Sequence, residues 1–462
     1  MARRQTRREF LKQTSVAGSA LTLSPLGIPA AEPIVLAAVP AAEEKATYAD
    51  RTRWFHQARF GMFIHWGLIS MARGCWGQQH ERLPKAEYAK LADRFNPDKF
   101  DADAWAGLAA EAGMKYMVLT TRHHDGFCLW DSQVTDFTSV KTAAKRDFVA
   151  AYVEACRRAG LKVGLYYSLV DWRFPGYWER EKYKNSAKAL VQQVHDQLRE
   201  LLTQYGPIDV LWFDGHWFQD KIEWLASKPN VISAFWRSDD LLKMIRKLQP
   251  QALVNDRLGV KGDFETTEQY VGSPGPGRAW EACMTIADND AWSYLSHNPS
   301  RKSTVQLLHH LVAAAREEGN FLLNVGPKPD GSIPEEEQER LRAIGQWMRV
   351  NGEAIRGSQC APTFGTALAF WTMNGNTGYL HVFSWPGEEM ALALIASKVK
   401  SARLLATGQE LSFRQEYNGR LVLNGMPAEP PDPYVSVIKV EFDGPFKALV
   451  EHDQASWLDG SA

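Results

Sequence analysis

Apolar and polar residues recur along most of the chain in a unit of one amphipathic helix, a glycine and one short apolar strand. In the clearest copy, residues 101–112 have helical periodicity, Gly113 ends the helix, and 116–121 form an apolar strand. Further helix and strand pairs are predicted at 147–159 and 163–168, 186–205 and 209–214, 241–248 and 252–256, and 305–318 and 321–325. With 60–66 as the first strand, this alternation predicts an α/β fold with a parallel sheet covered by helices.

An open doubly wound sheet and a closed barrel both satisfy this alternation. The positions of polar side chains favour one of these two folds. Polar residues follow the ends of many predicted strands: His65, His123, His124, Tyr167, Asp214, Arg257 and Glu281. The carboxyl ends of barrel strands meet at one face, whereas an open sheet offers mainly its switch point. We therefore predict an irregular (β/α)8-like barrel over residues 46–356. Neither glycine-rich nucleotide-binding motif is present.

The pattern changes after a predicted helix at 335–350. Short alternating stretches at 367–372, 378–384, 420–423 and 435–442 are separated by turn residues. This spacing predicts a C-terminal antiparallel β-sandwich over 362–462. The region has few clustered titratable groups, so we expect it to have a packing role, with sugar binding as the alternative.

The amino terminus has the pattern of a targeting segment. Thr6-Arg-Arg-Glu-Phe-Leu-Lys12 precedes a weakly apolar stretch of small residues, and Pro25, Pro29 and Pro33 interrupt that stretch. A membrane span needs about 20 uninterrupted apolar residues, so a twin-arginine-type export signal over 1–42 is favoured over an anchor. We expect the protein to be periplasmic or secreted, without stable membrane association.

Composition limits the classes of partner. Lys and Arg (53) nearly balance Asp and Glu (54), which argues against nucleic acid as a partner and favours a neutral one. The 17 Trp and 14 Tyr residues are weak support for sugar binding, because large barrels also bury aromatic residues. The five cysteines form no CxxC pair, which favours free thiols over a zinc framework.

Two adjacent histidines follow the strand at 116–121, within Arg122-His-His-Asp-Gly126. Neighbouring residues of an extended chain point to opposite sides, and no H-x-H or H-E-x-x-H motif accompanies them. We therefore expect His123 and His124 to hydrogen-bond sugar hydroxyls as neutral imidazoles, without a metal. One of the two could equally serve only the structure.

A carboxylate followed by glycine ends the strand at 209–214. Gly215 permits a sharp turn and a close approach of ligand, although an Asp there is also common as a simple turn residue. Trp212 lies two residues before Asp214 and shares its side of the strand. An aromatic wall beside the carboxylate favours a functional role for Asp214.

Hydrolysis of a glycoside needs a second carboxyl group, which lies roughly 5 Å from the first in retaining enzymes. Glu281, beside Trp280, is the preferred candidate because desolvation would favour its protonated form. Glu265 and Glu268 are its rivals.

Seven motifs together resemble the α-L-fucosidases of glycoside hydrolase family 29, from about residue 51 to the C-terminal sandwich. They are Phe60-Gly-Met-Phe-Ile-His-Trp-Gly67, Thr120-Thr-Arg-His-His-Asp-Gly-Phe127, Tyr166-Tyr-Ser168 with Asp171-Trp172, Leu211-Trp-Phe-Asp-Gly215, Val254-Asn-Asp-Arg257, Trp280-Glu-Ala-Cys-Met-Thr285 and Asn320-Phe-Leu-Leu-Asn-Val-Gly-Pro327. Any one is weakly specific, but seven in the family's order are highly specific.

The resemblance implies a retaining, cofactor-free and metal-free double displacement that releases α-L-fucose. Asp214 would be the nucleophile and Glu281 the acid/base, although the acid/base is the variable point of the family. The resemblance implies that substrate is held by His65, Trp76, His123, His124, Tyr167, Trp212, Arg257 and Trp292, with Trp292 near the methyl group of the sugar. Family members commonly have Glu-Trp where this chain has Cys75-Trp76, which affects the expected substrate preference more than the reaction type.

Three other functions remain as alternatives. A catalytically silent sugar-binding protein would not need both Asp214 and Glu281, and a metal-dependent hydrolase built on His123, His124 and Asp125 lacks H-x-H on the first strand. A glycosidase acting on a galactose-like sugar is the third. The fucosidic linkage, the acceptor and the number of subunits stay open.

Overall fold

The computed structural model describes residues 47–449 except 73, 81, 218–228, 274, 276, 289–290, 298–299, 362–365 and 367. The predicted export signal at 1–42 lies outside these residues. Within the described part, no helix combines the length and the apolar character that a membrane crossing requires.

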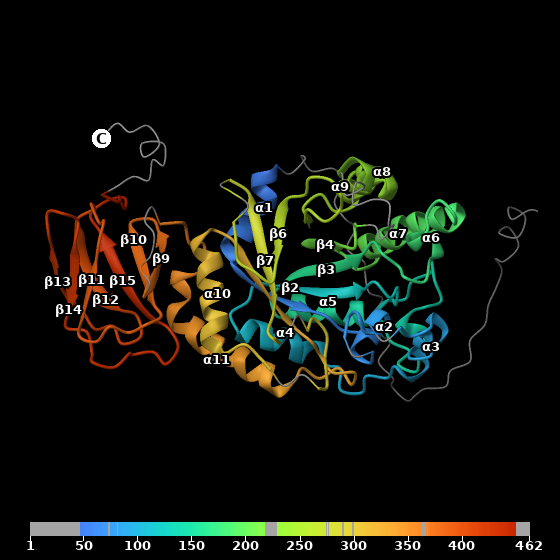
Figure 1. Cartoon of the computed structure of the whole chain (residues 1–462), viewed down its shortest axis with the longest axis horizontal. Helices are drawn as coiled ribbons and strands as arrows, with labels where there is room; N and C mark the ends of the chain where they lie inside the picture. Colours follow the sequence, from blue (N-terminus) through green and yellow to red (C-terminus); the bar gives the residue numbers. More distant parts are fainter. Residues whose placement is uncertain are drawn as a thin grey trace, which may run out of the picture. The chain divides into compact units, whose positions relative to one another are not determined.

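Eight parallel strands form the first sheet, in the order β5-β4-β3-β2-β1-β8-β7-β6 (Figure 1). A parallel bridge between Asn255 and Phe264 joins the two outer strands, so the sheet closes on itself. This closure excludes the open sheet and confirms the predicted irregular barrel. The strands are β1 (Phe60–Ile64), β2 (Tyr116–Arg122), β3 (Lys162–Ser168), β4 (Val210–Asp214), β5 (Leu253–Val254), β6 (Phe264–Glu268), β7 (Ala279–Thr285) and β8 (Asn320–Val325).

Helices precede most of these strands, as the sequence pattern predicts. Asp101 and Asp147 begin two of them by accepting hydrogen bonds from backbone N–H groups three residues later. Gly160 follows the second helix with φ 68°, a left-handed conformation that suits glycine. The helices are α1 (Tyr48–Ala58), α2 (Gly77–His80), α3 (Lys85–Ala89), α4 (Ala102–Glu111), α5 (Phe148–Arg158), α6 (Pro175–Trp178), α7 (Lys184–Gln204), α8 (Pro229–Trp236), α9 (Ser238–Leu248), α10 (Thr304–Arg316) and α11 (Glu335–Asn351).

The barrel strands are buried on both faces, and successive side chains alternate between them. On β7, Trp280, Ala282 and Met284 belong to the core between strands and helices, whereas Ala279 and Cys283 belong to a separate apolar cluster in the barrel interior. The residue between these two, Glu281, therefore faces the interior as well.

The barrel is least regular at β5, β6 and β7. Strand β5 has only two residues, and β6 is a strand that the sequence pattern did not predict. Among the described residues, no helix separates β5 from β6 or β6 from β7. The segment Gly272-Ser-Pro-Gly-Pro-Gly277 explains part of this, because glycine and proline disfavour helix.

Two antiparallel sheets follow, which confirms the predicted sandwich. One has the order β12-β15-β10-β9 and the other β11-β14-β13. The hydrogen bonds that connect this region to the barrel include those from Trp347 Nε1 to the Val435 carbonyl and from Thr372 Oγ1 to the Ala354 carbonyl. The strands are β9 (Ala369–Asn374), β10 (Thr377–Val382), β11 (Glu389–Leu392), β12 (Val399–Leu404), β13 (Ser412–Gln415), β14 (Leu421–Asn424) and β15 (Ser436–Phe442). β11, β12 and β13 were not predicted.

Candidate active site

One pocket opens where the barrel strands end. Seven of its side chains are predicted substrate-binding residues, and they surround Asp214. Only Tyr167 and Glu281, of the ten predicted site residues, do not line it. The lining consists of Phe63, His65, Cys75, Trp76, His123, His124, Tyr166, Trp212, Asp214, Trp217, Arg257, Glu268, Cys283 and Trp292.

Asp214 is held at the end of β4 by polar contacts. Tyr166 donates its hydroxyl hydrogen to Oδ2 at 2.9 Å, and Arg257 Nη1 donates to Oδ1 at 3.1 Å. Gly215 then turns the chain away with φ 72°, and a Cβ there would lie 2.7 Å from Val170 Cγ2. The predicted need for glycine after this carboxylate is thus explained by both conformation and space.

The surroundings of Asp214 keep it ionised. Burial by itself raises the pKa of this carboxyl group, but the positive charge of Arg257 and the Tyr166 hydrogen bond together hold the pKa below its usual value. An ionised carboxylate with its oxygens fixed suits a nucleophile.

The three predicted histidines are neutral. Burial lowers the pKa of His65 to about 3 and that of His124 to about 4, and it lowers the pKa of His123 well below the usual value. His65 Nδ1 lies 2.7 Å from Asn324 Oδ1, and His124 Nδ1 lies 2.6 Å from Ser168 Oγ. Neutral, oriented imidazoles can donate to and accept from sugar hydroxyls.

Arg257 joins the two carboxylates of the pocket. Its Nη1 contacts Asp214 at 3.1 Å, and its Nη2 lies 2.9 Å from Glu268 Oε2. Thr266 accepts from Nε, and the guanidinium carbon lies 4.8 Å from the centre of the Trp212 ring. One guanidinium group thus contacts both Asp214 and Glu268 and holds the two carboxylates close together.

Glu281, the predicted acid/base, lies in the barrel interior and has no exposed surface. Tyr116 donates its hydroxyl hydrogen to Oε2, and Trp212 Nε1 donates to Oε1 at 2.9 Å. Burial raises the pKa of this carboxyl group to about 7, against the effect of both hydrogen bonds. The expected shift toward the protonated form is present, but the side chain does not reach the pocket.

Strand register explains why Glu268 reaches the pocket and Glu281 does not. On paired strands β6 and β7, Glu268 lies opposite Cys283, which lines the pocket, whereas Glu281 lies one step deeper, opposite Thr266. The third candidate, Glu265, is on the other face of β6, where it forms an ion pair with Arg278 at 2.8 Å.

The prediction for Tyr167 is wrong. Its hydroxyl donates to Gln197 of α7 at 2.8 Å, so the side chain packs between the sheet and the helices. Its neighbour Tyr166 faces the pocket instead. The register explains this, because Tyr166 pairs with Trp212, which lines the pocket, and adjacent residues of a strand point to opposite faces.

Asp125 does not join the adjacent histidines in the pocket. Tyr88 donates to its Oδ2 at 2.6 Å, and the Phe127 backbone N–H donates to its Oδ1 at 3.1 Å. The predicted alternative of a metal site built on His123, His124 and Asp125 therefore lacks its carboxylate. Trp217, three residues after Asp214, lines the pocket without having been singled out from the sequence.

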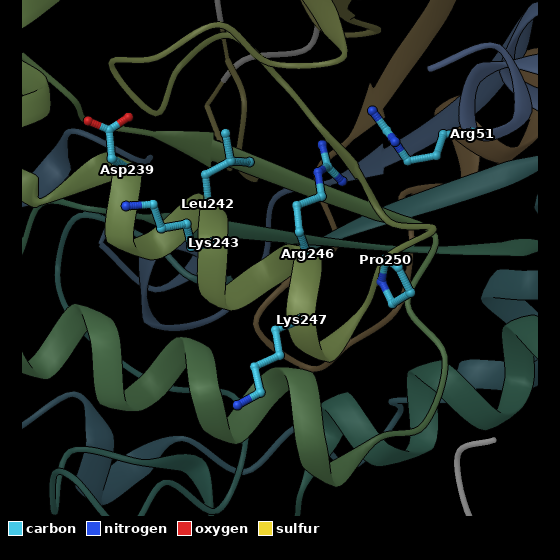
Figure 2. A pocket seen from close by; sticks show the side chains of 7 residues that line it. All are labelled: Arg51, Asp239, Leu242, Lys243, Arg246, Lys247 and Pro250. Atoms are coloured by element: carbon cyan, nitrogen blue, oxygen red, sulfur yellow. The ribbon is translucent and has the colours of Figure 1, made fainter. Parts of the chain in front are cut away.

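A wider hollow of about 840 Å³ lies elsewhere, beside α9. Asp239, Leu242, Lys243, Arg246 and Lys247 project from this helix, with Arg51 on another segment (Figure 2). Its lining has one carboxylate and no aromatic ring or imidazole, and Arg51 and Arg246 are both paired with Asp263. It therefore lacks the paired carboxyl groups that glycoside hydrolysis needs.

A family model described as α-L-fucosidase matches residues 37–353. The chain belongs to the α-L-fucosidase family. Tissue α-L-fucosidase of Bos taurus is 31% identical over 411 residues, which cover 82% of this chain and 85% of the relative. The predicted assignment to glycoside hydrolase family 29 and to a retaining, fucose-releasing enzyme is confirmed.

Solved structures agree in fold. α-L-Fucosidase isoenzyme 1 from Paenibacillus thiaminolyticus is 37% identical, with a TM-score of 0.77 over 86% of this chain and 99% of that chain. A family 29 enzyme from Bacteroides thetaiotaomicron is 29% identical, with a TM-score of 0.76 over 87% of this chain and 98% of that chain. That enzyme was trapped as a covalent intermediate with 2-fluoro-fucosyl fluoride, in a variant with one glutamate replaced by glutamine.

Proposed function

We propose that Asp214 is the nucleophile of this fucosidase and that Glu268, in place of Glu281, is its acid/base. The observation that carries the proposal is the shared contact of Arg257 with Asp214 at 3.1 Å and with Glu268 at 2.9 Å in one pocket. A covalent intermediate in a relative, obtained with a glutamate-to-glutamine variant, supports an Asp or Glu nucleophile assisted by a glutamate.

The two carboxyl groups exchange roles between the two steps. Asp214 attacks the anomeric carbon while Glu268 gives a proton to the departing oxygen, so a fucosyl ester forms and the glycosidic bond breaks. Glu268 then takes a proton from water, whose oxygen attacks the same carbon and releases Asp214. Substrate configuration is retained because the carbon is inverted twice.

Glu268 must carry a proton when the glycoside is bound. Its side chain is 42% exposed, so its ion pair with Arg257 is weak and can be given up. A sugar entering the pocket displaces water from this carboxyl group. Arg257 then keeps its contact with Asp214, which needs to stay ionised.

The remaining lining fits a deoxy sugar. His65, His123 and His124 offer neutral imidazoles for ring hydroxyls. Trp292 packs 5.0 Å from the His65 ring and 6.0 Å from the Phe63 ring, between centroids, and forms an apolar wall for the methyl group of fucose. A galactose-like sugar would place a hydroxyl against this wall. We further propose fucosylated glycans or glycosides as substrates and export through the signal at 1–42.

Leaving-group dependence tests the acid/base assignment. In Glu268→Ala, kcat/KM should fall by roughly 10²- to 10⁴-fold for an aryl α-L-fucoside with a poorly acidic phenol, because that phenol needs a proton to depart. The loss should be much smaller for a dinitrophenyl fucoside. Azide should restore turnover, since it attacks the fucosyl ester without needing a general base.

Two matched variants complete this test. Glu265→Ala, on the same strand but the opposite face, and Glu281→Ala should keep the leaving-group dependence of the unmodified enzyme and show no azide rescue. Rescue confined to Glu281→Ala would restore the original assignment and refute Glu268.

A further inference from the structure

The sugar pocket contains a set of donors that a carboxylate-based hydrolysis does not require. His65, Cys75 and His123 each have a ligand-type atom within 4.8 Å of the other two, and all three side chains are buried. All three line the pocket. Two imidazole rings and one thiol therefore lie close together in the sugar pocket.

His65 is oriented as a metal-binding histidine is, and His123 has a ring nitrogen without a partner among the described residues. Asn324 Oδ1 accepts from His65 Nδ1 at 2.7 Å, which leaves the lone pair on Nε2. Such an outer partner fixes the tautomer and the ring orientation of a ligating histidine. His123 is 6% exposed, and its Nδ1 is buried with no hydrogen-bond partner among the described residues. A buried, unpaired ring nitrogen is costly unless a ligand satisfies it.

We infer that His65, Cys75 and His123 form a binding site for a thiophilic divalent ion such as Zn²⁺ inside the sugar pocket. Two imidazoles, one thiolate and an open fourth position are a donor set that suits this ion. Tetrahedral coordination needs the donor atoms about 3.3–3.8 Å apart. These atoms lie within 4.8 Å of one another here, so each pair must approach by at most about 1.5 Å. Coordination releases the thiol proton of Cys75 to solvent, one proton for each ion bound.

Ion and sugar exclude each other at this site. This step rests on the proposed function, in which His65 and His123 hold hydroxyls of fucose. Coordination would occupy the nitrogens that those hydroxyls need. Zinc is therefore a competitive inhibitor, which raises the KM for an aryl α-L-fucoside and leaves kcat unchanged.

Equilibrium dialysis of the whole protein against zinc chloride tests binding without any turnover. We expect one zinc per chain, an affinity at least about tenfold weaker in Cys75→Ser, and a loss of about 10–100-fold in Asn324→Ala, which removes the partner of His65 Nδ1 together with a hydrogen bond to the Trp292 carbonyl. Cys283→Ser, in the same pocket, and Cys360→Ser, at an exposed thiol, should bind zinc as the unmodified protein does. Each variant must show a cooperative thermal transition, and Cys75→Ala replaces Cys75→Ser if it does not.

Saturating fucose should displace the ion from the unmodified protein. Four outcomes would each overturn the inference. They are an unchanged zinc affinity in both Cys75 variants, loss of zinc binding in Cys360→Ser, retention of zinc under saturating fucose, and inhibition of the enzyme by zinc through kcat alone. A fucosidase that binds no zinc would refute the metal site only. A chain that binds zinc but fails the tests at Asp214 and Glu268 would refute the catalytic assignments only.

Discussion

Asp214 ends strand β4 at the mouth of the barrel, whereas Glu281 lies midway along β7 in the barrel interior. Burial raises the pKa of both carboxyl groups. At the mouth, Arg257 contacts the carboxylate at 3.1 Å and reverses this effect, so the pKa of Asp214 is lowered. In the interior, Glu281 accepts hydrogen bonds from Tyr116 and Trp212 but contacts no cation among the described residues, and burial raises its pKa to about 7.

Trp212 separates the two regions. Its indole Nε1 donates to Glu281 at 2.9 Å, while its ring lies 4.8 Å from the guanidinium carbon of Arg257. The Trp212 ring thus lies between the charged residues at the barrel mouth, which a ligand can reach, and the buried residues around Glu281. The comparison teaches that burial alone does not select the charge state, because a contacting cation decides it.

The largest expected effect is at the mouth. Asp214→Ala should lower kcat/KM for an aryl α-L-fucoside by roughly 10⁴-fold or more, because the covalent step has no other nucleophile. Azide could then take the place of the carboxylate in a single displacement. The product would be β-L-fucosyl azide, whereas rescue of Glu268→Ala passes through the ester and gives α-L-fucosyl azide.

Nuclear magnetic resonance of the azide product separates these outcomes. α-L-Fucosyl azide from Asp214→Ala would show that another residue forms the ester. Asp214→Asn, which keeps the shape of the side chain, controls for collapse of the pocket.

Periodicity and glycine stops were sufficient to predict the barrel because each element carries its own signal in a short stretch of residues. The position of Asp214 was predictable for the same reason, since a buried strand ends there beside Gly215. Depth along a strand is a different property. Glu281 pairs with Thr266, so Glu268 lies two residues closer to the pocket along the paired strands β6 and β7. This register is set by pairing between strands, which the local sequence does not specify.

The short strand β5 and the missing helices near β6 were hidden for a related reason. Strand β6 is half-exposed and has the polar sequence Phe264-Glu-Thr-Thr-Glu268, so it lacks the apolar run that marks the other strands. Its place in the barrel comes from pairing with β7 and the bridge to Asn255. The glutamate that we propose as acid/base lies on this strand, which explains why the sequence favoured another.

A pair of adjacent tyrosines gives an intermediate effect. Tyr166→Phe removes the donor to Asp214 and should lower kcat/KM by about 10–100-fold, the loss expected for a hydrogen bond to a charged group. It should also raise the pKa of Asp214 and move the acidic limb of the pH–kcat/KM profile to higher pH. Tyr167→Phe removes a hydroxyl that contacts Gln197 and Arg122 outside the pocket, and it should leave both quantities unchanged. Equal losses in both variants would show that the effect is structural.

The smallest expected effect on activity is in the interior, where Glu281→Gln should change stability instead. The fold raises the pKa of Glu281 from 4.5 to about 7, so the carboxyl group stabilises the folded state fully below pH 4.5, and this contribution is lost as the pH rises to about 7. Between these limits, the free energy of unfolding of the unmodified protein should fall by roughly 3 kcal/mol relative to Glu281→Gln.

Urea unfolding of both proteins from pH 4.5 to 8 measures this difference. Burial also raises the pKa of Glu337 to about 7, but its contribution is the same in both proteins and cancels. A pH-independent difference together with a loss of kcat/KM by 10²-fold or more would place Glu281 in the reaction and remove the distinction between mouth and interior.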